Sequence, residues 1–357
     1  MPSQPVQPSG PAARGRRSGL GPHCVGQRVV VRRVLRGQTG PTGGPAMTDL
    51  LGVMESWTAE QTTVRAEDGT VTAITLRDIV SGKPVPPRPS TRLRVPAGEA
   101  ERIANAGWPS VQAEPLGDWL LRASAGFSTR ANSALVLGDP GRPLRDALDR
   151  VCSFYAAHGL APRAQVVVDS DEHASLERAG WVSARPGEAD TSFQLGSVSR
   201  ALRAARSLLP DPPGGQPVTT TGTATAAWLA DDARARAHPE AARAVLEGPP
   251  RVAFAAVPDQ AGVVLAKGRA AATAPGSPGE DWVGITDVWV HPEHRRRGLA
   301  QVVLTALLEW AAEGGATTAY LQVRRDNPAA LALYARLGFA AHHDYRYLTP
   351  AAPPPGE

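Results

Sequence analysis

The clearest alternation of apolar and polar positions covers residues 282–290 and predicts a strand that His291 and Pro292 close. Residues 300–314 then carry an apolar stripe at helical spacing, which predicts an amphipathic helix. The stripe consists of Val303, Leu304, Leu307, Leu308 and Trp310. A strand over 317–326, a short helix over 327–339 with a glycine stop, and one more strand follow. This order predicts a mixed α/β unit.

An earlier block of the chain repeats this order. Residues 164–171 predict a strand, 172–181 a short helix, and 191–195 another strand. Each block follows an amphipathic helix, ALDRVCSFYAAHG in one case and AQVVLTALLEWAAEGG in the other. We interpret this as a diverged tandem repeat, with one half over 97–207, a Pro/Gly-rich linker over 208–218 and a second half over 219–349.

The N-terminal block has a different pattern. Short β-rich runs, RVVVRRVL, DLLGVMESW, QTTVRA and TVTAITL, are separated by turn signals such as Asp68-Gly69. They predict a small SH3-like or similar β-barrel over 27–82. Residues 83–96, KPVPPRPSTRLRVP, predict a semi-rigid linker, and the compositions of 1–26 and 350–357 predict disorder.

Composition excludes several classes of function. Cys24 and Cys152 are too few for a disulfide framework and lack the spacing of a metal site. Lys83 and Lys267 are the only lysines, and neither precedes Ser or Thr, so no Walker A loop exists. No apolar run is long enough to span a membrane, and the N-terminus lacks a readable export signal, so we expect a cytoplasmic protein without membrane contacts.

The turn between the strand at 282–290 and the following helix has the sequence RRRGLA, residues 295–300. A helix N-terminus carries a partial positive charge, so arginines placed there are unfavourable unless an anion offsets them. Gly298 and Ala300 are small enough for backbone N–H groups to approach a ligand. This turn therefore predicts a phosphate or diphosphate site, with a solvated basic turn as the alternative.

The R-x-x-G-x-A turn after a strand ending Val-x-Val-His-Pro resembles the acetyl-CoA loop of the GNAT superfamily of N-acetyltransferases. The sequence NPAALALYARLGF resembles that superfamily's other signature helix, and the two motifs stand in the expected order within residues 282–348. KPVPPRP and GFSTRANS more loosely resemble an actinobacterial subgroup in which an SH3-like barrel precedes the acetyltransferase part. The resemblance implies an α/β (α+β) fold: a small barrel, then tandem GNAT-like halves, of which the second binds the cofactor.

The resemblance also implies roles for individual residues. Val288, Trp289 and Val290 would offer strand-edge backbone groups to the pantetheine arm of acetyl-CoA, and Asn327 would lie near this co-substrate. The residues expected around the diphosphate are Arg295, Arg296, Arg297, Gly298, Leu299 and Ala300. No metal is expected.

Two residues are candidates for the chemistry. Tyr334 stands at the superfamily's usual tyrosine position, where it would protonate the leaving thiolate; packing of a half-buried aromatic is the alternative. The attacking amine must be neutral, which costs roughly 4–5 kcal/mol at pH 7 if its pKa is about 10.4, so a base or a water chain is expected. Asp287 is the first candidate, although a solvated carboxylate at the strand edge is the competing interpretation. Backbone N–H groups of the same strand would polarise the acetyl carbonyl.

The two halves differ at the turn before the helix. The first half has LGDPGRPLRDAL at 137–148, where Asp139 and Pro140 replace the basic turn. An acidic, proline-stiffened turn repels a diphosphate, so only the second half is expected to bind acetyl-CoA. In the first half, GFSTRANS could line the acceptor pocket through Arg130 and Asn132, with a capped turn as the alternative.

The favoured function is therefore direct transfer of an acetyl group from acetyl-CoA to a primary amine, on a small molecule or a protein, in a ternary complex. Two alternatives stay open: an acyl-CoA-binding sensor, and a basic regulatory protein that binds nucleic acid or peptide. The second is motivated by a pI near 9.4 and disfavoured because the basic residues are interspersed with acidic ones. The sequence leaves the acceptor and the oligomeric state open.

Overall fold

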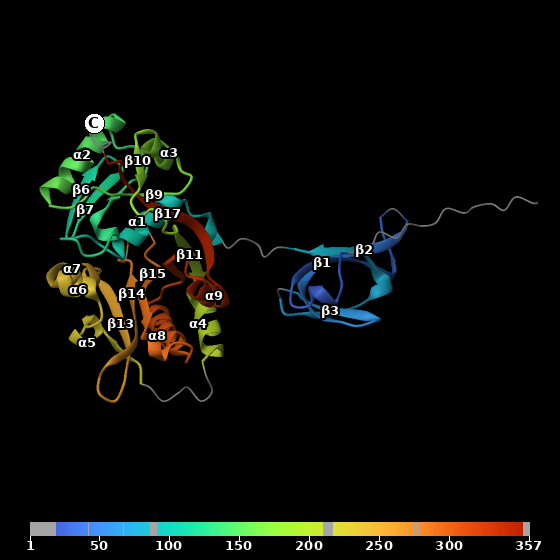
Figure 1. Cartoon of the computed structure of the whole chain (residues 1–357). Coiled ribbons are helices and arrows are strands. Elements are labelled where there is room, and N and C mark those ends of the chain that lie inside the picture. The colour runs from blue at the N-terminus through green and yellow to red at the C-terminus, as the bar shows by residue number, and fades with distance from the viewer. Residues whose placement is uncertain are drawn as a thin grey trace, which may run out of the picture. The chain divides into compact units, whose positions relative to one another are not determined.

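The structure, a computed structural model, describes residues 19–41, 43–66, 68–85, 91–209, 217–274, 276–277 and 279–352. The chain divides into two compact units, one within residues 1–89 and one within 90–357 (Figure 1). Predicted disorder over 1–18, and the parts of the predicted linkers and tail at 86–90, 210–216 and 353–357, lie outside the described residues.

The first unit is an antiparallel sheet in the order β4-β3-β2-β1-β5. Its strands are β1 (Arg28–Thr39), β2 (Pro45–Trp57), β3 (Gln61–Ala66), β4 (Val71–Thr75) and β5 (Ile79–Pro84). Leu20 and Cys24 pack into its core beside Val31 and Met54, so ordered structure begins upstream of the boundary expected at residue 26. Among the described residues no ladder joins β4 to β5, and the closed SH3-like barrel stays a prediction.

The second unit is a mixed α/β fold built on one large sheet. Its helices are α1 (Ala97–Ala106), α2 (Leu144–Ala157), α3 (Asp171–Arg178), α4 (Val198–Ser207), α5 (Ala226–Leu229), α6 (Ala233–Ala237), α7 (Pro239–Glu247), α8 (Leu299–Glu313) and α9 (Pro328–Arg336). Its strands are β6 (Gln112–Leu116), β7 (Trp119–Ala123), β8 (Ala134–Leu135), β9 (Ala164–Val167), β10 (Trp181–Ser183), β11 (Thr191–Ser197), β12 (Thr219–Thr221), β13 (Arg251–Pro258), β14 (Val264–Ala272), β15 (Trp282–Val290), β16 (Thr318–Arg324) and β17 (Ala340–Pro350).

The elements predicted for both repeats are present, with ends shifted by a few residues. In each half, a helix connects two parallel strands: α2 connects β8 to β9, and α8 connects β15 to β16. The two halves share one sheet, in the order β12-β13-β14-β15-β16-β11-β17-β9-β8-β7-β6, with β10 beside β17.

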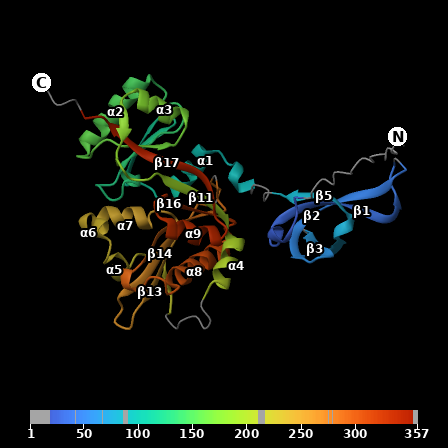
Figure 2. The same ribbon diagram turned by 45° about the vertical axis from the view of Figure 1, so that its right-hand side comes forward.

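The halves exchange strands at the centre of this sheet (Figure 2). β11, from the first half, lies between β16 and β17 of the second half. β17 in turn lies between β11 and the first half's β9. Each half therefore completes its sheet with a strand of the other, and residues far apart in the chain are brought together.

Helices cover both faces of the second half's sheet. Ala253, Ala255 and Val257 of β13 pack into a cluster with α4 and α8, whereas Phe254 and Ala256 pack into a separate cluster with α5–α7. This alternation is the period of a strand buried on both faces. It explains why β13 and β14 are nearly continuous in apolar and small residues.

A β-bulge interrupts β15. Lys267 pairs with Trp289 and Arg269 with Thr286, so Gly268 stands opposite two residues, Asp287 and Val288. Asp287 has a φ of 50°, which is uncommon for a residue other than glycine. A Cβ on Gly268 would lie 2.8 Å from Val303 Cγ1, so glycine lets α8 pack directly against the bulge.

We expect Gly268→Ala to lower the free energy of unfolding by about 1–3 kcal/mol, because Val303 is fully buried and has no room to yield. Gly222→Ala is the matched control, since its Cβ would meet nothing within 4 Å and its φ is not positive. Urea unfolding of both variants gives the comparison; equal midpoints would show that the bulge tolerates a side chain.

Candidate functional site

A pocket of about 320 Å³ opens where β15 and β16 separate. Their parallel pairing runs from Trp282 and Thr318 to Ile285 and Leu321. The pocket wall begins directly after it, at Thr286 and Asp287 of one strand and at Gln322 of the other. The remaining wall residues are Trp108, Ser128, Thr129, Arg130, Arg185, Thr191, Arg234, Arg324, Tyr345 and Tyr347. Both halves of the repeat thus contribute to one pocket.

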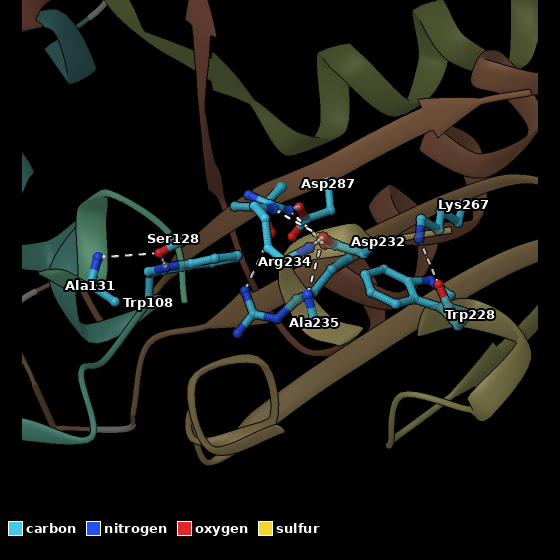
Figure 3. A network of polar contacts seen from close by, with 11 residues as sticks. Trp108, Ser128, Ala131, Trp228, Asp232, Arg234, Ala235, Lys267 and Asp287 are labelled. Carbon is cyan, nitrogen blue, oxygen red and sulfur yellow. Dashed lines mark hydrogen bonds and ion pairs between the residues drawn. The ribbon is translucent and has the colours of Figure 1, made fainter. Parts of the chain in front are cut away.

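Asp287 is a half-buried carboxylate in this wall, placed there by the bulge. Its Oδ1 accepts a hydrogen bond from Arg234 Nη2 at 3.2 Å, and its Oδ2 is buried without a partner among the described residues. Figure 3 shows Arg234 beside both Asp287 and Asp232, and it forms an ion pair with each. The hydrogen bond from Arg234 to Asp232 holds the pKa of the arginine above its usual range.

Asp232 fixes this arrangement because it also begins α6. Its Oδ1 accepts from the backbone N–H groups of Arg234 and Ala235, the geometry of an N-cap (Figure 3). The backbone of Arg234 is therefore fixed at the start of α6. Its guanidinium is neutralised by Asp232 and also pairs with Asp287. Sequence reasoning missed both residues, because a cap before a five-residue helix gives no sign of the strand that it faces.

Lys267 is buried on β14, and its Nζ donates to the carbonyl of Trp228 at 2.6 Å. The ammonium also lies 4.6 Å from the Trp228 ring centroid and 5.6 Å from that of Trp289. Burial lowers the pKa of Lys267. Lys267 thus connects α5 to β14 and to Trp289, at the end of β15 that is predicted to bind the co-substrate.

Arg269 connects the two halves beneath the pocket. Its guanidinium is fully buried and donates to the carbonyls of Leu246, at the end of α7, and Gly107, at the end of α1. It also donates to Thr286 Oγ1 at 3.3 Å and lies over the Trp108 ring. Carbonyls at helix C-termini favour a cation. Burial nevertheless lowers the pKa of Arg269 to about 10.

The predicted anion site lies at the start of α8. Gly298 is the N-cap, with a φ of 79°, and no side chain caps the first turn. The first N–H groups of a helix have no partner within the helix, so they face outward here. Arg295, Arg296 and Arg297 are exposed, and none forms an ion pair within the described parts of the chain.

The equivalent turn of the first half is already satisfied by the chain's own carboxylates. Gly138 N donates to Glu172 Oε1 at 2.7 Å, Asp139 N to Asp118 Oδ2 at 3.0 Å, and Gly141 N to Asp139 Oδ1 at 2.7 Å. Carboxylates of the chain therefore occupy amides of the loop before α2, while the first turn of α2, like that of α8, has no side-chain cap. The first half thus has acidic side chains around its loop where the second half has Arg295, Arg296 and Arg297, and diphosphate binding by the second half alone stays a prediction.

The other predicted residues occupy several environments. Beyond Ile285, the edge of β15 that faces β16 pairs with no strand in the described structure, and Val290 O accepts from Arg295 Nε at 3.3 Å. Val288 and Val290 pack against the cluster that contains α8. Asn327 caps α9, because its Oδ1 accepts from Ala330 N, so the side-chain oxygen is already engaged and the Nδ2 amide remains as a donor.

Tyr334 lies in the same apolar cluster, 8% exposed, and does not line the pocket. Its hydroxyl forms no hydrogen bond within the described residues, and burial raises its pKa to about 12. Asp287 and Tyr334 are thus associated with opposite faces of β15. Arg130 lines this pocket, whereas Asn132 is buried and holds its own loop by accepting from Ser124 N and donating to Phe127 O.

Residues 98–348 match the family model described as "Probable histone acetyltransferase Rv0428c C-terminal". The match covers most of the chain and contains both halves of the repeat. The chain belongs to this acetyltransferase family. It is therefore an enzyme of the GNAT acyltransferase type, as the two motifs predicted.

Similar proteins agree with this assignment. The "Probable histone acetyltransferase Rv0428c" of Mycobacterium tuberculosis is 28% identical over 331 residues, 91% of this chain and 95% of that protein. The "Uncharacterized N-acetyltransferase YobR" of Bacillus subtilis is 27% identical, over 69% of this chain and 96% of that one. A tandem GNAT protein from the clavulanic acid biosynthesis pathway has a TM-score of 0.50 at 19% identity, covering 63% of this chain and 76% of the other. This last likeness supports a tandem GNAT fold for the second unit.

Within the described residues of this GNAT enzyme, no cluster of three or more His, Cys, Asp or Glu side chains is arranged to hold a metal ion. Among the described helices, none has the length and apolar character needed to cross a membrane.

Proposed function

We propose that this enzyme transfers an acetyl group from acetyl-CoA directly to a primary amine. The observation that carries the proposal is the start of α8: an uncapped first turn with three exposed arginines that lack ion-pair partners in the described chain. An anion would offset the positive charge of this turn, whereas the loop before α2 in the first half is surrounded by the carboxylates of Glu172, Asp118 and Asp139.

The residues around this turn fit acetyl-CoA, which would supply the activated acetyl thioester. Arg295 to Ala300 would hold the diphosphate through guanidinium groups and backbone N–H groups. The unpaired edge of β15 at Val288, Trp289 and Val290 would bond the amides of the pantetheine arm. Asn327 would add contacts near the start of α9, apart from the oxygen that caps the helix.

The acceptor side is the pocket at the bulge. Asp287 would take the proton from the amine, directly or through a water molecule, because its Oδ2 has no partner in the described chain. N–H groups on the unpaired edge of β15 would polarise the acetyl carbonyl. Donor site and pocket adjoin the same strand, which supports direct transfer without a covalent intermediate on the enzyme. A sensor that only binds acyl-CoA would not need this second pocket.

Tyr334 is the proposed donor of a proton to the leaving thiolate. A thiol has a pKa near 8.5, so its thiolate leaves readily, and we expect Tyr334→Phe to lower kcat by only about 10–100-fold, less than loss of a base. Because burial raises the pKa of Tyr334 to about 12, it stays protonated below pH 11, and kcat should not fall between pH 9 and 10. Release of CoA thiol with a panel of amines measures the kcat of Tyr334→Phe and the pH dependence of the wild-type kcat. An undiminished rate in Tyr334→Phe would remove this residue from the mechanism.

A further inference from the structure

The pocket beside Asp287 is lined by more arginine than an amine acceptor alone requires. Arg130, Arg185, Arg234 and Arg324 all contribute to its wall. Three of them are neutralised by the chain: Arg234 by Asp232, Arg185 by Glu188, and Arg324 by Glu188 and Asp326.

Arg130 differs from the other three. It forms no ion pair with any carboxylate of the described chain. Its Nη2 donates to the Tyr345 hydroxyl at 3.3 Å, its Cζ lies 5.6 Å from the Trp108 ring centroid, and its Nε is buried without a partner. A largely enclosed guanidinium without a counter-ion is costly unless a ligand supplies the negative charge.

A second unpaired donor lies in the same part of the wall. The Tyr345 hydroxyl that accepts from Arg130 donates to Gln322 Oε1 at 3.2 Å, and Gln322 Nε2 is buried without a partner among the described residues. Arg130 and Gln322 thus form one cluster of donors around Tyr345. Asp287 is the only acidic residue in the pocket wall within the described chain, and its free oxygen accepts rather than donates. The pocket therefore combines a donor cluster for an anion with one acceptor for an amine.

We propose that the acceptor is a small amine that also carries an anionic group, carboxylate or phosphate, with its anion at Arg130 and Gln322 and its amine at Asp287. This rests on the proposed function and names the substrate class of the same pocket. A volume of about 320 Å³ is at the lower end for ligand pockets, which suits a metabolite. A lysine-rich protein segment would bring further positive charge to a pocket that has an unneutralised arginine.

The test compares acceptors in pairs, by release of CoA thiol from acetyl-CoA. Each ω-amino acid from glycine to 6-aminohexanoate is paired with the alkylamine of equal length, the matching ω-aminoalkyl phosphates form a second arm, and a lysine-rich peptide forms a third. We expect one length of anionic amine to exceed its alkylamine at least about 10-fold in kcat/KM, the effect of a hydrogen bond to a charged group. The arm with the higher kcat/KM identifies the anion.

Variants tie the preference to the pocket. Arg130→Gln should bring the ratio of kcat/KM between the anionic amine and its alkylamine close to one, and Arg130→Lys should retain part of this preference. Arg178 is an exposed arginine on α3, so Arg178→Gln should leave the ratio as in the wild type. Urea unfolding of each variant verifies that it folds. Equal use of alkylamines, preference for the peptide, or an unchanged ratio in folded Arg130→Gln would overturn the inference alone. Failure of every amine to release CoA would overturn the proposed function and this inference together.

Discussion

Asp287→Asn should lower kcat/KM for the acetyl acceptor by about 10²–10⁴, the contribution of a positioned general base. The substitution keeps the size of the side chain and its contact with Arg234 but removes the group that accepts the proton. The loss should narrow as the pH rises towards the amine's own pKa of about 10.4, because a larger fraction of the amine is then neutral without help. Steady-state rates between pH 7 and 10 measure both effects.

Asp259→Asn is the matched control, because Asp259 lies in the turn between β13 and β14, where an asparagine can keep its bonds to Ala261 N and Val263 N. Thermal stabilisation of Asp287→Asn by acetyl-CoA shows whether the donor site is intact. A loss of rate that stays constant over this pH range would assign Asp287 a structural role instead.

Arg297→Glu should weaken acetyl-CoA binding by about 10²–10³. Loss of a hydrogen bond to a charged group costs about 1.5–3 kcal/mol, and the new carboxylate repels the diphosphate. Arg297 precedes the N-cap of α8, and an acidic residue near a helix N-terminus is favourable by up to about 0.3–1 kcal/mol, so the variant should unfold at the same urea concentration or a higher one. We thus expect the affinity for acetyl-CoA to fall while the stability stays the same or rises, which a misfolded variant would not show.

The control for this charge reversal is Arg145→Glu, in the first turn of α2 in the first half, where Glu172, Asp118 and Asp139 bond amides of the preceding loop. Calorimetric titration with acetyl-CoA should give the wild-type affinity. Equal weakening in both variants would show that overall charge, and not the α8 turn, determines the affinity.

The sequence predicted features that are local in the chain. Arg295 to Ala300 are contiguous, and the helix that follows them has a regular apolar stripe, so turn and helix could be placed together. Chemistry also distinguished the two halves: Asp139 in place of an arginine predicted a turn without an anion, and the structure adds that the chain's own carboxylates occupy its amides.

The pocket depends on long-range pairing that no local pattern reveals. Arg130 meets Tyr345 because β17 crosses into the first half's sheet, and Asp287 enters the wall because a bulge breaks the alternation of β15. Arg234, on the short helix α6, pairs with Asp287, and Lys267, on the buried strand β14, contacts Trp228. The sequence patterns of α6 and β14 indicate secondary structure and give no sign of a pocket. The alternation of apolar and polar residues cannot predict the strand exchange, since β11 and β17 would have the same alternation in a sheet of either half.

The most direct test of the account is a crystal structure of the enzyme with CoA. We predict density for the diphosphate within hydrogen-bonding distance of the backbone N–H groups at the start of α8, with Arg296 or Arg297 in contact and the pantetheine arm along the unpaired edge of β15. Density for the diphosphate at the turn before α2, or well-ordered CoA that leaves the α8 turn without an anion, would contradict it.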